Sequence, residues 1–202
     1  MIFLVRHGET AGNASRVIQF PETALSPRGI AQAKRLAERL ALQGVARILA
    51  SDYARAQMTA LPVQRATGVS LELDPGLRER NFGDLRGTAY ADLEVDPFAP
   101  GYTPPGGESW EDLHARVDEV WARIRTAAAE TRGNLLVVTH GLVCHSLAEW
   151  HLDLEDGMSW DAGFQNTSVT LIDPEPPWRV RLLNCTAHLD GDTTHDHRTR
   201  QV

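Results

Sequence analysis

The sequence Ile2-Phe3-Leu4-Val5-Arg6-His7-Gly8 decides which fold this chain can adopt. Its apolar residues suffice for a buried strand, and the charged residues and glycine that follow indicate a loop at the strand's carboxyl end. The same pattern returns where the apolar residues 135–138 lead into Thr139-His140-Gly141. Ligands of parallel α/β sheets bind beyond the carboxyl ends of the strands. His7 and His140 are therefore the first candidates for a functional site.

Helices and strands alternate along the rest of the chain. Further strands are expected at residues 45–50, 71–73, 168–172 and 179–183. Helices are expected from Ser26-Pro27 to Gly44, over residues 53–67, after the N-cap Ser109, and from His140-Gly141 to about His151. This alternation predicts an α/β fold, a three-layer sandwich in which helices cover both faces of a mostly parallel central sheet.

Two segments depart from this alternation. Residues 85–107 are rich in proline and glycine, which predicts an excursion over the sheet edge with one helical turn near residues 90–93. Residues 191–202 are polar, so we expect a disordered tail there and one domain over residues 1–190.

Composition narrows the class of function. The formal net charge of −7 argues against a general nucleic-acid surface. No apolar run approaches the roughly 20 residues that span a bilayer, and we expect a cytoplasmic protein. Cys144 and Cys185 lie too far apart for a metal-binding or redox spacing. Lys34 is the only lysine, so the cations that bind a phosphate here are expected to be arginines, which suits bidentate contacts.

The first strand end carries the residues that phosphoryl transfer needs. A neutral imidazole at His7 is a good nucleophile toward phosphorus, and Arg6 supplies a charged clamp. Gly8 would let the backbone approach a bound anion closely. The alternative is that His7 merely ends a strand.

Arg55, Glu79 and His140 each allow two interpretations. Arg55 is expected in the first turn of a helix, where the helix dipole disfavours a cation unless an anion is bound, although it could simply face solvent. Glu79 lies between two arginines and is either a general acid or a surface carboxylate in an ion pair. His140 is either a phosphate ligand or a satisfied core histidine.

Taken together, these motifs resemble those of the histidine phosphatase superfamily, which includes the cofactor-dependent phosphoglycerate mutases. The resemblance covers roughly residues 1 to 190 and keeps the order of the motifs. The matching residues are Arg6-His7-Gly8-Glu9-Thr10 with Asn13, Arg16, Gln19, Leu25-Ser26, Gly29 and Gln32-Ala33, then Ser51-Asp52, Arg55-Ala56, Thr59, Glu79, Gly83, Gly87, Gly106-Gly107-Glu108-Ser109 and His140-Gly141.

The resemblance implies a role for each candidate. His7 takes the phosphoryl group, and Glu79 protonates the leaving oxygen and then activates the attacking water. The remaining residues are expected to bind the phosphate, with Arg6, Arg55 and His140 also stabilising the transition state; they are Arg6, Gly8, Asn13, Gln19, Arg55, His140 and Gly141. Neither a metal ion nor another cofactor is expected, because the arginines and His140 neutralise the charge.

Three positions depart from the family pattern. Phe20 stands where a glycine often follows the glutamine, Arg86 where an acidic residue is common, and Leu142 where a second glycine is frequent. The loops that carry Phe20 and Arg86 are expected to border the pocket, so these departures leave the substrate open.

The sequence favours a phosphatase for small-molecule phosphate monoesters over two alternatives, a phosphoglycerate mutase and a non-catalytic phosphate-binding module. Residues 87–107 contain no lysine or arginine and carry Asp92, Glu94 and Asp96, which should disfavour a second anionic group. The expected partners are a small phosphate ester and, as an alternative to a monomer, a second copy in a homodimer. Neither nucleic acid nor membrane is expected.

Overall fold

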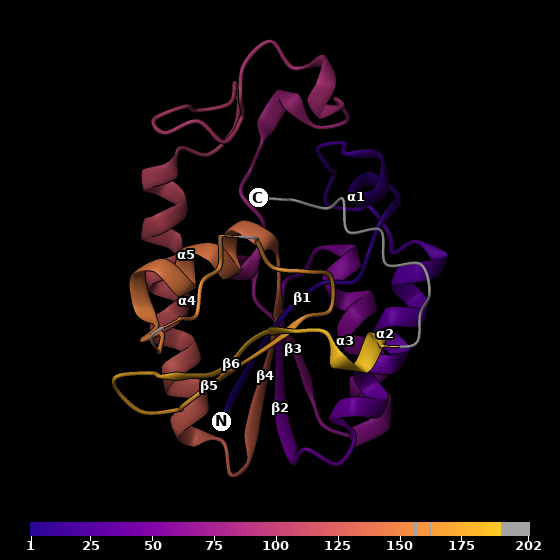
Figure 1. Ribbon diagram of the computed structural model, residues 1–202, viewed down its shortest axis with the longest axis vertical. Helices are drawn as coiled ribbons and strands as arrows, with labels where there is room; N and C mark the ends of the chain where they lie inside the picture. Colours follow the sequence, from indigo (N-terminus) through magenta and orange to yellow (C-terminus); the bar gives the residue numbers. More distant parts are fainter. Residues whose placement is uncertain (156, 162, 191–202) are drawn as a thin grey trace.

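The residues described in this computed structural model, 1–155, 157–161 and 163–190, contain a six-stranded sheet with the order β3-β2-β4-β1-β5-β6 (Figure 1). Its strands are β1 (Ile2–Arg6), β2 (Val45–Ala50), β3 (Leu71–Leu73), β4 (Asn134–Thr139), β5 (Val169–Ile172) and β6 (Val180–Cys185). The tail expected at residues 191–202 lies outside the described residues.

The register of the sheet explains where the two histidines lie. The strands β3, β2, β4 and β1 are parallel neighbours, and β5 runs antiparallel to both β1 and β6. The mostly parallel sheet is thus confirmed. Arg6 pairs with Thr139 at the carboxyl ends of β1 and β4, which places the next residues of the two strands, His7 and His140, side by side.

Helices cover both faces of the sheet, as expected for three layers (Figure 1). They are α1 (Ala11–Ser15), α2 (Pro27–Leu40), α3 (Ala54–Thr67), α4 (Trp110–Glu130) and α5 (Gly141–His151). Alternate side chains of β1 serve the two layers: Phe3 and Val5 pack with α2 and α3, whereas Ile2 and Leu4 pack with α4 and α5. None of the described helices is both long and apolar enough to cross a membrane.

The helix starts follow the local sequence closely. Ser26 caps α2 with Pro27 in its first turn, and Ser109 and Asp112 form the capping box of α4. The end of α2 differs from our expectation, because the helix stops at Leu40 and residues 41–44 form a turn. Gly44, with φ of 63°, then reverses the chain into β2.

The short helix α1 was not expected. Thr10 caps it by accepting a hydrogen bond from the backbone N–H of Asn13, whose side chain accepts in return from the N–H of Thr10. A helix of five residues leaves no clear periodic pattern in the sequence, but it places Asn13 beside the strand ends.

The excursion at residues 85–107 stands beyond the carboxyl ends of the strands rather than over the sheet edge (Figure 1). The helical turn expected at residues 90–93 is a 3-10 turn, Tyr90–Asp92. Buried Arg80 holds the excursion in place, because it donates to the carbonyl oxygens of Pro97 at 3.0 Å, Tyr102 at 2.5 Å and Glu108 at 3.0 Å. Its guanidinium also lies 4.0 Å from the ring centre of Trp110. These contacts hold the excursion above the strand ends that carry His7 and His140.

Candidate active site

A cavity of about 490 Å³ lies between the strand ends and the excursion. This volume is in the range of small-molecule sites. The candidate residues that line it are Arg6, His7, Asn13, Gln19, Arg55, Glu79 and Gly141. The excursion and the segment before it add Phe82, Arg86, Tyr90, Leu93, Glu94, Val95, Asp96, Pro97 and Phe98. His140 and Gly8 are buried immediately behind this surface.

The hydrogen bonds of His7 fix which nitrogen can attack. Its Nδ1 lies 2.7 Å from the carbonyl oxygen of Gly8, and its Nε2 lies 3.2 Å from Nε of Arg55. A carbonyl can only accept and a guanidinium can only donate. The ring is therefore neutral, with its proton on Nδ1 and its lone pair on Nε2. This is the form in which an imidazole is a nucleophile.

The surroundings of His7 keep it in that form. Burial lowers the pKa of His7 well below its ordinary value, and the charges of Arg55 and Arg6 lower it further. Two buried cations next to the ring make a further positive charge unfavourable, so His7 stays unprotonated at neutral pH.

His140 lies against His7, with 5.1 Å between the ring centres. Its Nε2 is 2.8 Å from Oγ of Ser51, whereas its Nδ1 is buried and has no hydrogen-bond partner among the described residues. Burial lowers the pKa of His140 well below its ordinary value, with the charge of Arg55 as the next cause. A buried ring nitrogen without a partner among the described residues is available to a ligand, and a phosphate oxygen is one group that it could bind.

Arg6 and Arg55 bring two buried positive charges to the strand ends. Arg6 donates to the carbonyl oxygen of Phe164 at 2.5 Å, and Arg55 donates to that of Phe20 at 3.0 Å. Burial lowers the pKa of Arg55 to about 10, so it remains a cation at neutral pH. Arg55 is in the first turn of α3, as expected, and it is buried rather than facing solvent. A bound anion would offset both its burial and the helix dipole.

Glu79 belongs to the cavity and not to a surface ion pair. Its Oε2 accepts from the backbone N–H of Leu142 at 3.3 Å, in the first turn of α5, and its Oε1 accepts from that of Arg80 at 3.1 Å. Arg78 pairs with Asp52 instead, and Arg80 is engaged with carbonyl oxygens. The two arginines that flank Glu79 in the sequence therefore leave its carboxyl group free to act in the cavity.

Asn13 and Gln19 are both held through Thr10. Oδ1 of Asn13 accepts from the N–H of Thr10 at 3.2 Å and from Nδ2 of Asn166 at 3.3 Å, and Oε1 of Gln19 accepts from the hydroxyl of Thr10 at 2.8 Å. With Oδ1 engaged, the amide NH₂ of Asn13 is the group that can donate to a phosphate oxygen.

The structure gives Gly8 a different position from the expected one. Its N–H donates to Oγ1 of Thr59 at 2.9 Å, and a Cβ there would lie 2.9 Å from the carbonyl oxygen of Gly29. Glycine is required at this position because the loop packs tightly against α2. Its carbonyl oxygen orients His7, and it does not line the cavity.

Of the three positions that depart from the family pattern, two line the cavity and one does not. Arg86 and Leu142 line the cavity, the former as expected, but Phe20 does not; it is 45% exposed and its ring covers Gly87. Sequence reasoning missed Asn166, whose Nδ2 donates to the carbonyl oxygen of His7 at 2.9 Å. No local pattern marks a residue that reaches the site only because β5 lies beside β1.

Comparison with known proteins settles the family. The family model of the histidine phosphatase superfamily (branch 1) matches residues 2–186. The chain belongs to the histidine phosphatase superfamily. Among curated relatives, a probable phosphoglycerate mutase GpmB of Enterobacter sp. (strain 638) is 33% identical over 207 residues, which cover 94% of this chain and 95% of the relative. A protein with the same name from Yersinia pestis (strain Pestoides F) is 32% identical, with 94% of each chain covered.

Solved structures share the fold and carry other names. Bacillus stearothermophilus YhfR has a TM-score of 0.79 at 27% identity, with 94% of this chain and 98% of that one covered. A mycobacterial glucosyl-3-phosphoglycerate phosphatase in complex with VO3 has a TM-score of 0.78 at 27% identity, with 92% and 99% covered. This member of the superfamily therefore resembles proteins named as mutases and proteins named as phosphatases.

Proposed function

We propose that this histidine phosphatase superfamily member is a metal-independent phosphatase that hydrolyses small-molecule phosphate monoesters through a phosphohistidine at His7. One observation carries the proposal: the neutral His7 lines the cavity together with Arg6, Arg55 and Glu79, and its unprotonated Nε2 faces the guanidinium of Arg55. A nucleophile, a charged clamp and an acid are the groups that this chemistry requires.

The reaction would take place in two steps. Arg6, Arg55 and His140 bind the phosphoryl oxygens while Nε2 of His7 attacks phosphorus. The bond from phosphorus to the ester oxygen breaks, and Glu79 donates its proton to that oxygen. In the second step Glu79 takes a proton from water, the water oxygen attacks the phosphohistidine, and the N–P bond breaks to release phosphate and regenerate His7.

The two guanidinium groups would do what a metal ion does in other phosphotransfer enzymes, since they offset the charge of the phosphoryl group. Among the described residues, no group of three or more His, Cys, Asp or Glu side chains is arranged to hold a metal ion. We therefore expect EDTA to leave activity intact and vanadate, a mimic of five-coordinate phosphorus, to inhibit.

Two alternatives differ from this proposal in the fate of the bound phosphate ester. The mutase alternative is favoured by the names of the curated relatives, and the phosphatase by those of the solved structures. A non-catalytic binding module usually lacks the nucleophile or the second histidine, and this chain has both His7 and His140. The proposal also includes a cytoplasmic location and, as an alternative to a monomer, a homodimer.

The direct test is turnover of p-nitrophenyl phosphate by the wild-type protein and by His7→Ala. The wild type should release p-nitrophenol with EDTA present, and acid-labile, alkali-stable label should be trapped on His7 when turnover of a ³²P-labelled ester is quenched. His7→Ala should lose several orders of magnitude of activity because the covalent route is gone. Label on another residue type, or full activity of His7→Ala, would falsify the mechanism.

A further inference from the structure

Five arginines line the cavity, which is more than one phosphoryl group needs; they are Arg6, Arg16, Arg55, Arg80 and Arg86. The proposed phosphate clamp uses Arg6 and Arg55. Arg80 has its donors engaged with the carbonyl oxygens of the excursion. Arg16 and Arg86 remain to be explained.

Arg16 and Arg86 lie at two segments of the chain that are joined by backbone hydrogen bonds. The N–H of Tyr90 donates to the carbonyl oxygen of Arg16 at 2.9 Å, and the N–H of Gly87, next to Arg86, donates to that of Ile18 at 2.8 Å. The N–H of Ile18 donates to the carbonyl oxygen of Thr88 at 3.0 Å in the opposite direction. Residues 16–18 and 87–90 thus form a short paired ribbon that joins the loop after α1 to the excursion. Both arginines are built into the cavity wall by this ribbon.

Neither guanidinium forms an ion pair with a carboxylate of the described residues. Arg16 lies over the ring of Tyr90 at 5.5 Å, and Arg86 reaches the hydroxyl of Tyr53 at only 3.5 Å. Several arginines outside the cavity are paired with carboxylates, as Arg47 is with Glu72 and Arg123 with Asp74. Two cations in the cavity wall that have no carboxylate partner among the described residues can take their counterion from the ligand.

The electrostatics at Arg55 agree with this. The positive charge of Arg86 is among the causes, smaller than burial, that lower the pKa of Arg55. The two like charges therefore act on one another in the same cavity. An anionic group beside Arg86 would relieve this repulsion in addition to the phosphoryl group that Arg55 binds.

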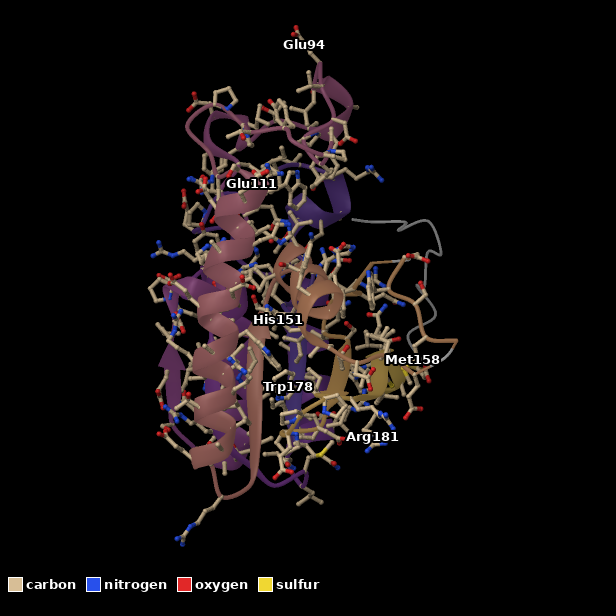
Figure 2. All side chains as sticks on the ribbon, turned by 90° about the vertical axis from the view of Figure 1, so that its left-hand side faces the viewer. Glu94, Glu111, His151, Met158, Trp178 and Arg181 are labelled. Carbon is tan, nitrogen blue, oxygen red and sulfur yellow. The ribbon has the colours of Figure 1, made fainter. Side chains whose placement is uncertain are left out.

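Two acidic residues of the excursion, Glu94 and Asp96, also line the cavity, whereas Asp92 does not. Asp96 accepts from the backbone N–H of Phe98 at 2.9 Å. Glu94 is exposed and points outward from the tip of the excursion (Figure 2). Because Glu94 and Asp96 lie in the cavity wall, the expectation that acids here disfavour a second anionic group still applies. They lie close enough to favour a singly charged carboxylate over a doubly charged second phosphate.

We infer that the cavity takes phosphate esters whose organic part bears a carboxylate, bound by Arg86 with Arg16 as the second cation. The inference rests on the proposed phosphatase function and adds the substrate class. It depends on Arg86, a cation that lines the cavity and has no carboxylate partner among the described residues. Arg86 would set specificity through the carboxylate, while the chemistry stays with His7 and Glu79.

The test compares 3-phosphoglycerate with glycerol 3-phosphate, which differ only in a carboxylate against a hydroxymethyl group. The wild type should prefer 3-phosphoglycerate by about tenfold or more in kcat/KM, as expected for a hydrogen bond to a charged group. Arg86→Gln should abolish most of that preference by raising KM for 3-phosphoglycerate, and Arg16→Gln should reduce it less. Neither should change kcat/KM for glycerol 3-phosphate by more than about twofold. Arg132→Gln, an exposed position between α4 and β4, controls for the loss of one positive charge.

Each outcome separates this inference from the function on which it rests. No phosphate release from any ester, p-nitrophenyl phosphate included, overturns the phosphatase itself. Full activity on p-nitrophenyl phosphate, with equal kcat/KM for 3-phosphoglycerate and glycerol 3-phosphate, overturns only the carboxylate subsite. A preference that survives Arg86→Gln also overturns it. A further arm compares kcat/KM for fructose 1,6-bisphosphate and fructose 6-phosphate. If the bisphosphate is preferred more strongly than 3-phosphoglycerate is preferred over glycerol 3-phosphate, the subsite binds a second phosphate, which contradicts the assignment to a carboxylate.

Discussion

Nε of Arg55 donates to Nε2 of His7 at 3.2 Å, so a buried cation lies on the nitrogen that is proposed to attack phosphorus. This contact orients the imidazole and opposes its protonation. It also means that Arg55 must change partner during the reaction. When a phosphoryl group binds, the same N–H can donate to a phosphate oxygen, and the lone pair of His7 becomes free to attack.

Arg55→Lys tests this double role, because lysine keeps the charge but loses the planar fork. We expect kcat/KM on p-nitrophenyl phosphate to fall by about 10²- to 10³-fold, the usual loss for one donor to the transition state. Arg65→Lys, an exposed position near the end of α3, is the matched control and should keep wild-type activity. Activity of Arg55→Lys within about threefold of the wild type would show that charge alone suffices.

Part of this site could be predicted because it depends on local sequence. His7 and His140 each follow an apolar strand, and parallel strands bring their carboxyl ends to one edge of the sheet. Arg55 was recognised by its position in a first helical turn. Each of these signals lies within a few residues of the side chain that it identifies.

The remainder depends on contacts between distant segments. Ser51 reaches His140 across 89 residues of sequence, and Asn166 reaches His7 across 159. Gly8 was predicted to approach an anion, whereas the packing of its loop against α2 decides its role. The loop of Phe20 borders the pocket as expected, because Gln19 lines it and the carbonyl oxygen of Phe20 accepts from Arg55, but the ring of Phe20 covers Gly87. Sequence patterns do not encode which of two neighbouring surfaces a loop residue will meet.

The stability of the protein should depend on pH through His7. The pKa of His7 is lowered in the folded protein, so the unfolded chain binds more protons below about pH 6.5. The contribution of His7 to stability is thus complete above that pH and is lost as the pH falls toward its folded-state pKa. For one such group the free energy of unfolding should decrease by about 1.4 kcal/mol per pH unit in this window.

His7→Gln, which cannot titrate, should lessen this decrease. The measurement is urea unfolding at pH 7.5 and at pH 5.5, and the quantity compared is the difference between the two pH values, so that any constant effect of the substitution cancels. The same pH dependence in His7→Gln and in the wild type would mean that His7 is already protonated in the folded protein.

Glu79→Gln should affect substrates according to their leaving group. Glutamine keeps the size of the side chain and can accept one of the two backbone N–H groups, from Arg80 or from Leu142, but it has no acidic proton to give to an ester oxygen. We expect most activity to be lost on alkyl phosphates, whose leaving oxygen needs protonation, and a smaller loss on p-nitrophenyl phosphate. The measured quantity is the ratio of kcat/KM values for the two esters. Equal losses on both would remove Glu79 from the role of general acid.

Hydrolysis should exceed isomerisation. After the first step a mutase must retain its product, let it reorient and keep water from the phosphohistidine. A reacting bisphosphate carries much more negative charge than a carboxylated monoester, and residues 87–107 bring no lysine or arginine to hold it. Arg16 and Arg86 can bind one carboxylate, but Glu94 and Asp96 line the same cavity and oppose further negative charge.

The decisive comparison incubates the enzyme with 3-phosphoglycerate and a catalytic amount of 2,3-bisphosphoglycerate, then measures 2-phosphoglycerate against free phosphate. Water should discharge the phosphohistidine before a weakly held product can reorient, so free phosphate should form faster. His7→Ala should form neither product, which separates the enzyme's reaction from a contaminant. If 2-phosphoglycerate instead forms much faster than phosphate is released from any tested ester, the excursion retains the intermediate despite its acids. The chain is then a mutase, and the carboxylate that Arg86 binds serves the transfer of phosphate within one molecule.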